Sequence, residues 1–460
     1  MSVLWTSAEI AAATGGTASS DFSVTGVTFD SREVIGGELF IALRGESTDG
    51  HKFIDQARER GAGGFLVSEP VDGAHVRVAD TTAALEALGN ASRGRSDARV
   101  IGVTGSVGKT SVKEALKLAL ERFAPERTHA SVKSYNNHTG VPLSLARMPA
   151  DSRFGIFEMG MNHPGELTAL TQMVRPHVAI VTWVASAHRE FFATEADIAD
   201  AKGEIFAGLE PGGTAIIPFD SEHRDRLLGH ARPHAAHILT FGEGEGADIR
   251  ARRFSLQPDC TTVTADVAGE VLTYKVGMAG RHWLNNSLAV LAGVKAAGGD
   301  LGLAGLALAG LTGLPGRGRR LRVNREGGQA VVIDEAYNAN PASMTAALAV
   351  LGEIAPNGGG RRLAVLGSMK ELGELSDDFH AGLAPAVEAA HVTHAILVGR
   401  EIEPLADALK RRIKVEHVGD SAAAIQAVER ALRADDVLLV KGSNSVGLGR
   451  LVAHFQGVEA

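Results

Sequence analysis

The segment GVTGSVGKT, Gly102–Thr110, is a glycine-rich loop between an apolar run at 100–103 and a helical pattern. That pattern consists of apolar residues at helical spacing, namely Val112, Leu116, Ala119, Leu120 and Phe123. Strand, glycine loop and helix in this order predict a P-loop, because backbone N–H groups and the helix N-terminus converge on a phosphate. Lys109 adds a cation for the β- and γ-phosphates, and the Thr110 hydroxyl can hold Mg²⁺. The segment therefore predicts a site for ATP or GTP.

The loop departs from the strict pattern G-x-x-x-x-G-K-[ST], because Val103 stands where that pattern has its first glycine. A glycine turn that merely opens an amphipathic helix is the alternative interpretation. The flanking pattern and the adjacent Lys109 and Thr110 favour phosphate binding. The residues that we expect to contact the nucleotide are Thr104, Gly105, Ser106, Val107, Gly108, Lys109, Thr110 and Ser111.

Apolar runs alternate with helical patterns on both sides of the loop, which predicts an α/β protein. At roughly 150 residues per domain, a chain of 460 residues is expected to form about three domains. The expected strands are 24–29, 38–43, 64–67 and 75–78, then 100–103, 154–157, 178–184 and 214–217, and last 330–333, 363–366, 395–398 and 437–440. We predict a small N-terminal α/β domain at 1–97, a central P-loop domain with a mostly parallel sheet at 98–314, and a doubly wound, Rossmann-like domain at 315–460.

Composition narrows the class of protein. The net charge of −8 argues against a general nucleic-acid-binding surface. Cys260 is the only cysteine, which excludes an internal disulfide and a CxxC metal site and fits a reducing cytosol. The first residues lack the pattern of a secretory signal, and the apolar run at 301–314 is too short to span a membrane. We therefore expect a soluble, cytoplasmic protein.

Three residues outside the loop have chemistry that suits a nucleotide site. Glu158 directly follows the apolar run at 154–157, where parallel sheets form ligand sites and where Mg²⁺ needs oxygen ligands. An ordinary surface glutamate explains that position equally well. His188 and Lys202 are by default a packed or surface histidine and a solvated helix lysine. Spacing alone selects neither of them.

A dense basic cluster follows the expected junction near residue 315. It consists of Arg317, Arg319, Arg320, Arg322 and Arg325. The cluster is either a solvated basic face or a set of arginines that clamps phosphate when the domains close. Nucleic-acid binding is disfavoured because no aromatic residues are interleaved with the charges.

Taken together, these motifs resemble the Mur ligases of peptidoglycan precursor synthesis over essentially the whole chain. The resembling segments are the P-loop variant, Asp30–Arg32, 37–43, 49–51, Ser134–Leu143, Phe157–Gly160, Ala201–Phe206, Val365–Gly373 and Lys441–Ser443. Within the family, DEAYNANP at Asp334–Pro341 resembles the branch that adds D-alanyl-D-alanine. The resemblance implies an N-terminal domain for the UDP end of the substrate, a central ATPase domain and a Rossmann-like third domain.

The resemblance also implies roles for single residues. Thr110 and Glu158 would hold one Mg²⁺, while His188 and Lys202 would serve a second, with Lys202 carbamylated by CO₂. Arg317 would lie near the γ-phosphate, Asn286 near the adenine and Asp334 near the ribose. Implied substrate contacts are Ser31, Arg32, Asn136, Asn137, Thr139, Tyr337 and Asn338. Trp283, Ser368 and His138 depart from the family pattern.

The implied reaction is ATP-dependent. ATP phosphorylates the terminal carboxylate of UDP-N-acetylmuramoyl-tripeptide, and the amine of D-alanyl-D-alanine then attacks the acyl phosphate. Small-molecule substrates, ATP, Mg²⁺ and a monomer are the expectations, without nucleic acid or membrane insertion. The third residue of the tripeptide and the resting conformation are not predicted by the sequence.

Other functions would require other motifs. The ligase that adds meso-diaminopimelate or lysine would carry D-N-P-R, and folylpolyglutamate synthase would carry D-G-A-H-N-P in place of Asp334–Pro341. A GTP-dependent switch would need an N-K-x-D motif. A non-synthesising amidotransferase subunit of the same fold would need a zinc-ribbon cysteine set, which one cysteine cannot supply.

Overall fold

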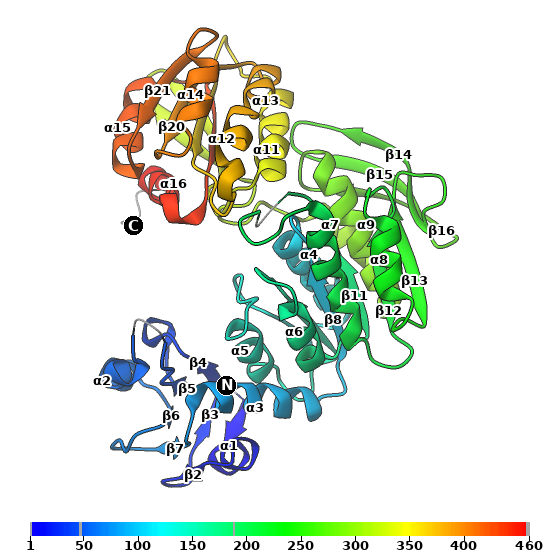
Figure 1. Ribbon diagram of the computed structural model, residues 1–460, viewed down its shortest axis with the longest axis vertical. Coiled ribbons are helices and arrows are strands. Elements are labelled where there is room, and N and C mark those ends of the chain that lie inside the picture. Colours follow the sequence, from blue (N-terminus) through cyan, green and yellow to red (C-terminus); the bar gives the residue numbers. More distant parts are fainter. Residues whose placement is uncertain (1, 46–47, 187–188, 457–460) are drawn as a thin grey trace.

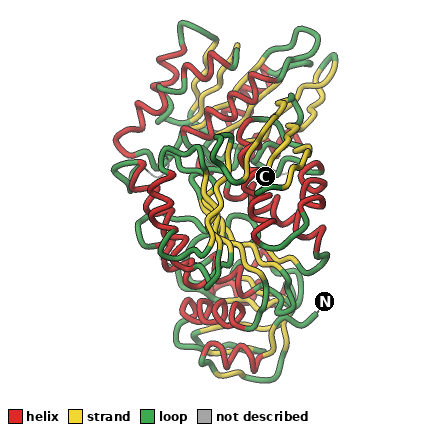
Figure 2. The backbone as a smooth tube through the Cα atoms, turned by 90° about the vertical axis from the view of Figure 1, so that its right-hand side faces the viewer, coloured by secondary structure: helices red, strands yellow, loops and turns green. Residues whose placement is uncertain are grey.

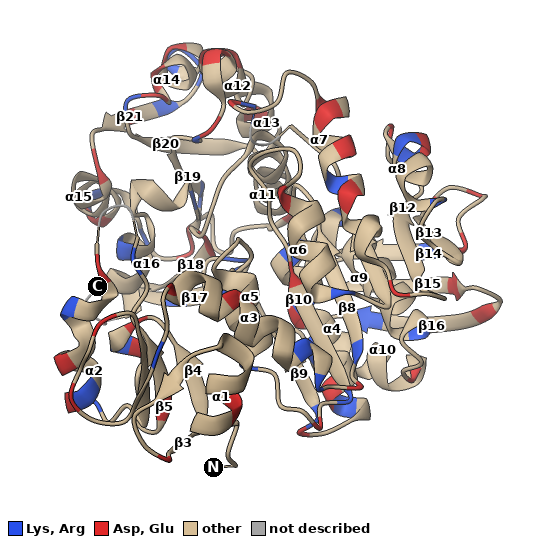
Figure 3. Cartoon of the chain, turned by 60° about the horizontal axis from the view of Figure 1, so that its bottom comes forward, with Lys and Arg blue, Asp and Glu red and all other residues tan. Residues whose placement is uncertain are grey.

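The computed structural model describes residues 2–45, 48–186 and 189–456. Three α/β parts follow one another along its longest axis, with the N-terminal part at one end and the C-terminal part at the other (Figure 1). Basic and acidic residues are interspersed over all three parts (Figure 3). Among the described residues, no helix has both the length and the apolar character that a membrane span requires.

The central part contains the P-loop and is built on the largest sheet, which has nine strands within the described residues. In spatial order these are β16 (Glu270–Val276), β15 (Thr261–Val267), β14 (Ile249–Leu256), β13 (His237–Gly242), β12 (Thr214–Pro218), β11 (Val178–Val181), β8 (Arg99–Thr104), β10 (Phe154–Glu158) and β9 (Thr128–Ala130). The run from β14 to β9 is parallel, and β15 and β16 add an antiparallel edge.

Helices cover both faces of this sheet (Figure 2). One face packs against α4 (Lys109–Phe123), α9 (Arg281–Ala296) and α10 (Leu301–Ala309). The other packs against α5 (Gly140–Ala146), α6 (Glu166–Val174), α7 (Glu195–Gly203), η3 (Glu204–Gly208) and α8 (Arg224–Ala231). Successive residues of β8 alternate between the two cores, since Ile101 and Val103 belong to the core on the α4 side and Val100 belongs to the core on the other side. A strand that is buried on both faces reads as a continuous apolar run, which is why β8 was predictable.

The N-terminal part has a five-stranded sheet within the described residues, in the order β2 (Thr17–Ala18), β7 (His75–Arg77), β6 (Gly64–Val67), β5 (Glu38–Ile41) and β4 (Gly26–Thr28). Its remaining elements are β1 (Trp5–Thr6), β3 (Ser23–Val24), α1 (Ser7–Thr14), η1 (Ser31–Glu33), η2 (Gly50–Phe53), α2 (Ile54–Glu59) and α3 (Thr81–Gly94). Leu143 and Ala146 of α5 belong to its core, and Trp5 Nε1 donates to the Ala146 carbonyl over 2.8 Å. The N-terminal and central parts therefore share a packed interface.

The C-terminal part has a six-stranded sheet within the described residues, in the order β17 (Arg319–Arg325), β18 (Gly328–Glu335), β22 (Val437–Lys441), β19 (Arg362–Gly367), β20 (Val392–Val398) and β21 (Lys414–Val418). Only β17 is antiparallel to its neighbour. The helices on one face are α11 (Pro341–Glu353), α12 (Ser376–Ala381), α13 (Ala384–Ala389) and α14 (Glu403–Leu409), and those on the other are α15 (Ser421–Ala431) and α16 (Gly449–Gln456). The short helices η4 (Gly373–Leu375) and η5 (Asn444–Val446) complete this part.

Each strand expected from an apolar run is present, but several boundaries differ. The run at 24–29 forms two short strands, β3 and β4, and the strand expected at 178–184 ends at Val181. Strands β1, β2, β9, β13 to β17 and β21 were not predicted. We expected the basic cluster to be either a solvated basic face or a set of arginines that clamps phosphate. Most of its arginines lie in the edge strand β17. The domain boundaries at 97/98 and 314/315 stay predictions.

Candidate active site

A cavity of about 640 Å³ lies between the central and C-terminal parts. Its walls come from the P-loop and the end of β10 on one side, and from the residues that follow β18, β19 and β22 on the other. The carboxyl ends of both parallel sheets therefore open onto one space, which is where α/β sheets bind ligands. Asn340 joins the two sides directly, because its Nδ2 donates to the Ser106 carbonyl over 3.4 Å.

The P-loop needs glycine at two positions. Gly105 has a φ of +152°, and a Cβ there would lie 1.9 Å from Thr182 Oγ1. Gly108 has a φ of +85°, and a Cβ there would lie 2.7 Å from Asn286 Oδ1. Val103, in contrast, is a fully buried residue of β8, so the departure from the strict motif falls within the strand. The loop therefore keeps the glycines that allow positive φ angles and that let the backbone N–H groups come close to a phosphate.

Lys109 is the first residue of α4, and its Nζ donates to the Gly105 carbonyl over 2.7 Å. Burial lowers the pKa of the Lys109 ammonium, an effect that the nearby Glu158 carboxylate opposes and Arg317 reinforces. An anion beside Nζ would favour the charged form. The site therefore suits a phosphate group.

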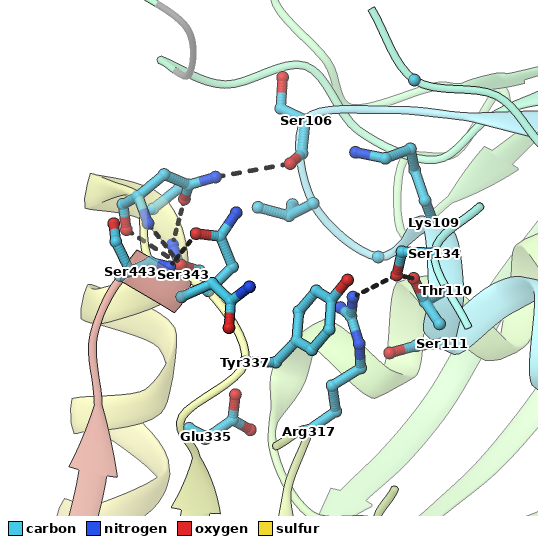
Figure 4. A pocket seen from close by; sticks show the side chains of 18 of the residues that line it. Ser106, Lys109, Thr110, Ser111, Ser134, Arg317, Glu335, Tyr337, Ser343 and Ser443 are labelled. Atoms are coloured by element: carbon cyan, nitrogen blue, oxygen red, sulfur yellow. Dashed lines mark hydrogen bonds between the residues drawn. The ribbon is translucent and has the colours of Figure 1, made fainter. Parts of the chain in front are cut away.

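Glu158 is the centre of a polar network at the end of β10. It is 1% exposed, and its Oε2 accepts a hydrogen bond from Thr110 Oγ1 over 2.7 Å. Asn136 Nδ2 donates to the other carboxylate oxygen over 2.8 Å. Ser134 Oγ lies 3.4 Å from Thr110 Oγ1 and accepts from Arg317 Nη2 over 3.3 Å (Figure 4). The buried carboxylate is therefore held by two hydrogen bonds.

Arg317 reaches across the cavity from the segment before β17. Its Cζ lies 4.1 Å from the centroid of the Tyr337 ring, and both side chains line the cavity (Figure 4). A guanidinium that lies over an aromatic ring can still donate its N–H groups to oxygen atoms in the plane of the guanidinium. Of the basic cluster, Arg317 lines the cavity, whereas the other four arginines belong to β17 and do not line it.

Lys202 is buried, and its default interpretation as a solvated helix lysine is wrong. It lies on α7, is 1% exposed and lines the cavity. Burial lowers the pKa of its amine well below the usual value, and repulsion from Lys109 adds to the effect. A lower pKa increases the share of the amine that is neutral and therefore nucleophilic. His188, proposed as its companion, lies outside the described residues.

Glu335 and Lys441 form part of the wall that sequence reasoning missed. Lys441 is 3% exposed, and its Nζ donates to Glu335 Oε2 over 3.5 Å and to the Asn338 carbonyl over 3.0 Å. Burial raises the pKa of the Glu335 carboxyl and lowers the pKa of Lys441. Both residues end adjacent parallel strands, β18 and β22, and that position was the available signal.

Several predicted site residues do not line this cavity. Ser31 Oγ donates to Gln56 Oε1 over 2.6 Å, and the Arg32 side chain is 81% exposed beside Asp30. Asn137 Oδ1 accepts from the backbone N–H groups of Thr139 and Gly140, which starts α5. The Asp334 carboxylate, 2% exposed, accepts from the Gly316 N–H over 2.7 Å behind the cavity wall. The lining residues among those predicted are Ser106 to Ser111, Asn136, Glu158, Lys202, Asn286, Arg317, Tyr337 and Asn338.

The oxygen atoms at the cavity suit a Mg²⁺ ion that is bound partly by the nucleotide phosphates. They do not suit an ion that is held by protein ligands alone. Within the described residues, no group of three or more His, Cys, Asp or Glu side chains could hold a metal ion. The Thr110 hydroxyl and the Glu158 carboxylate nevertheless lie together at the P-loop. Mg²⁺ commonly uses one or two protein oxygens and takes its remaining ligands from phosphates and water.

Comparison with known proteins agrees with this arrangement. Family models match residues 23–127 (Mur ligase family, catalytic domain), 103–294 (Mur ligase middle domain) and 319–444 (Mur ligase, glutamate ligase domain). The UDP-N-acetylmuramoyl-tripeptide–D-alanyl-D-alanine ligase of Escherichia coli is 33% identical over 441 residues, covering 95% of this chain and 94% of the relative.

Two solved structures are also similar over nearly the whole chain. A crystal structure of MurF from Acinetobacter baumannii has a TM-score of 0.84 and 30% identity and covers 98% of this chain and 99% of its own. MurF ligase from Thermotoga maritima, crystallised in complex with ADP, has a TM-score of 0.76 and 26% identity, covering 94% and 97%. With its P-loop, its buried Glu158 and its three matching domains, this chain belongs to the Mur ligase family.

Proposed function

We propose that this chain joins D-alanyl-D-alanine to UDP-N-acetylmuramoyl-tripeptide and converts ATP to ADP and phosphate. The observation that carries the proposal is the single cavity onto which the P-loop, Glu158 and the Tyr337–Asn338 segment all open. The Escherichia coli relative is named for this reaction. Asp334–Pro341, the segment that resembles the D-alanyl-D-alanine branch, includes part of the cavity wall.

In the first step, an oxygen of the tripeptide's terminal carboxylate attacks the γ-phosphorus, and the bond from that phosphorus to ADP breaks. Lys109 and Arg317 supply positive charge where the two anions meet. The glycine backbone at 105 and 108 admits the phosphates closely, and Asn286 approaches Gly108 at the same edge. Phosphorylation is needed because a carboxylate would otherwise have to expel an oxide.

In the second step, the deprotonated amine of the dipeptide attacks the acyl carbon, and phosphate leaves from the tetrahedral intermediate. Tyr337 and Asn338 line the C-terminal side of the cavity and would orient the amine. The Lys441 ammonium holds the Asn338 carbonyl and thereby fixes this segment. The reacting groups thus approach one another from two different sheets.

Thr110 and Glu158 are the residues that would hold Mg²⁺, and Lys202 as a carbamate would add an anionic oxygen for a second ion. The ion supplies charge neutralisation on the phosphates when it is bound. Carbamylation requires the neutral amine that the burial of Lys202 favours. We include both features in the proposal, together with a cytoplasmic location and a monomeric state.

The more distant contacts are also part of the proposal. Ser31, Arg32, Asn137 and Thr139 would meet the UDP-sugar end, and Asp334 would meet the ribose. The hydrogen bonds that now engage Asp334 and Asn137 would have to be shared or exchanged when substrate binds. A boundary near residue 97 and another near 314 would let the three domains close around the cavity.

The test is phosphate release from ATP by the purified chain with a panel of acceptors and amines. The proposal expects release that depends on both UDP-N-acetylmuramoyl-tripeptide and D-alanyl-D-alanine. Release with the dipeptide precursor and a diamino acid would assign the preceding ligase step instead. Hydrolysis that is indifferent to both substrates would favour a nucleotide-dependent switch.

A further inference from the structure

Lys113 is a fully buried lysine that the proposed mechanism does not use. It lies on α4, one turn after Lys109, and its side chain is 0% exposed. A buried ammonium is costly unless its three N–H donors are all satisfied. Lys113 offsets that cost with two hydrogen bonds, to the carbonyls of Ser131 and Lys133 at 2.6 and 2.7 Å, and with an ion pair to Glu114 Oε1 at 2.8 Å.

Both carbonyls belong to the loop that follows β9. Lys133 has a φ of +51°, a left-handed conformation that costs free energy in a residue other than glycine. Such a conformation persists where its surroundings impose it, and the bond from Lys113 to the Lys133 carbonyl is one such constraint. Ser131 Oγ in turn accepts from the Glu158 N–H over 3.1 Å, so the loop is also attached to the end of β10.

The next residues of this loop reach the nucleotide site and the N-terminal part. Ser134 contacts Thr110 and Arg317, and Asn136 donates to Glu158. Tyr135 donates its hydroxyl hydrogen to Glu33 Oε1 over 2.8 Å. One short segment therefore connects the P-loop helix, the buried carboxylate and the domain expected to bind the UDP end.

We infer that Lys113 is a positioning residue whose buried ammonium fixes the loop at 131–136, so that Ser134 and Asn136 hold Thr110, Glu158 and Arg317 in register before nucleotide binds. An apolar side chain at this helix position would fill the space but leave the buried Ser131 carbonyl and the partly buried Lys133 carbonyl without this donor. The loop would then lose both its attachment to α4 and the constraint on Lys133. The inference rests on the proposed function only for its effect on turnover.

The first test measures amide hydrogen exchange in the nucleotide-free protein, which does not depend on the reaction. The variant is Lys113→Met, and the matched control is Lys117→Met, which changes a lysine one turn further along the same helix. We expect the backbone amides of the loop at 131–136 to exchange at least about tenfold faster in Lys113→Met, with no change at Leu116 in the helix core. Equal loop exchange in the two variants would overturn the inference.

The second test separates positioning from a general loss of stability. Asn136→Ala is combined with Lys113→Met, and phosphate release is measured for the two single variants and the double variant. If Lys113 acts through the loop, the two losses overlap and the double variant is far less impaired than the product of the single effects. Fully multiplicative losses would contradict the inference.

A conservative variant, Lys113→Gln, keeps the inference testable if Lys113→Met does not fold. Lys113→Gln keeps two N–H donors for the two carbonyls and should give loop exchange and turnover between those of the wild type and Lys113→Met. If Lys113→Met does not fold, Lys113→Gln and Lys117→Met supply the same comparison, and equal exchange again overturns the inference. Absence of tripeptide-dependent release by the wild type would count against the proposed function alone, because hydrogen exchange still tests Lys113.

Discussion

Thr110 Oγ1 lies 2.7 Å from Glu158 Oε2, so the residue after the P-loop lysine is hydrogen-bonded to the carboxylate that ends the neighbouring parallel strand. The contact joins residues 48 positions apart in the chain. It exists because β8 and β10 pair in parallel, which brings the start of α4 and the end of β10 to the same edge. The hydroxyl and carboxylate oxygens of this pair are ligands of the kind that Mg²⁺ prefers.

Glu158→Gln should therefore impair the metal-dependent reaction while preserving the shape of the site. The amide removes the negative charge but can still accept from Thr110. We expect turnover at a fixed, low Mg²⁺ concentration to fall about 10- to 100-fold, with partial recovery as Mg²⁺ is raised. Phosphate release titrated with Mg²⁺ measures this. Glu222→Gln, which changes an exposed acid, is the control, and the same titration curve for both variants would argue against Glu158 as a ligand.

Lys109→Ala should abolish acyl-phosphate formation. The lysine is the cation of the P-loop, and loss of one such group from a preorganised site costs about 100- to 1000-fold in rate. The fold should survive, because the one hydrogen bond that Nζ makes to a described residue is to the Gly105 carbonyl. Circular dichroism together with phosphate release tests both parts. Near-normal turnover by a folded variant would remove the assignment of this loop to ATP.

Lys202→Ala should be inactive and partly rescued by small carboxylates. Formate or acetate can enter the space left by the side chain and place oxygens where the carbamate oxygens would lie. The measurement is phosphate release against carboxylate concentration, with chloride at equal ionic strength as the control. Activity that stays flat with every carboxylate would oppose carbamylation and leave the ligase assignment intact.

Stability should fall on acidification partly through His129. Its Nε2 lies 2.8 Å from the Ser144 carbonyl, and burial lowers the pKa of the ring from 6.5 to about 4. Between these values the unfolded chain binds a proton that the folded chain does not, so the free energy of unfolding decreases as pH falls from 6.5 towards 4. The steepest contribution is about 1 kcal/mol per pH unit.

His129→Gln should flatten that dependence, because the amide can still donate to the Ser144 carbonyl but does not titrate. Urea unfolding of the wild type and the variant at pH 5 and pH 7 measures the difference. His234→Gln, on an exposed loop, should leave the wild-type slope unchanged. A slope that His129→Gln does not alter would mean that the pKa of the ring is the same in the folded and the unfolded chain.

The sequence predicts a site residue well when residues near it in the chain form its environment. It predicts the residue poorly when tertiary packing forms that environment. The P-loop was predictable because strand, glycine turn and helix are contiguous in the chain. The position of Glu158 after an apolar run fitted a ligand site and an ordinary surface glutamate equally well. Lys202 was assigned to solvent by its spacing, since its burial comes from the packing of α7 against the rest of the central part. Its place at the site came from the family resemblance alone.

The same distinction explains what was missed in the fold. Thr261–Val267 alternates buried and partly exposed residues along β15, a period-2 pattern that was present but not used. The edge strand β17 was not predicted because its arginines interrupt the run of apolar residues by which the other strands were identified. Charged residues are common on edge strands. Lys441 and Glu335 are 106 positions apart, so only the pairing of β18 with β22 brings them together.

The most direct test of the account follows one oxygen atom. The terminal carboxylate of UDP-N-acetylmuramoyl-tripeptide is labelled with ¹⁸O and incubated with the chain, ATP, Mg²⁺ and D-alanyl-D-alanine, and the released phosphate is examined by mass spectrometry. If the carboxylate attacks the γ-phosphorus and the amine then displaces phosphate, each released phosphate carries one labelled oxygen. Unlabelled phosphate would mean that ATP is hydrolysed by water, and the ligase account would be contradicted.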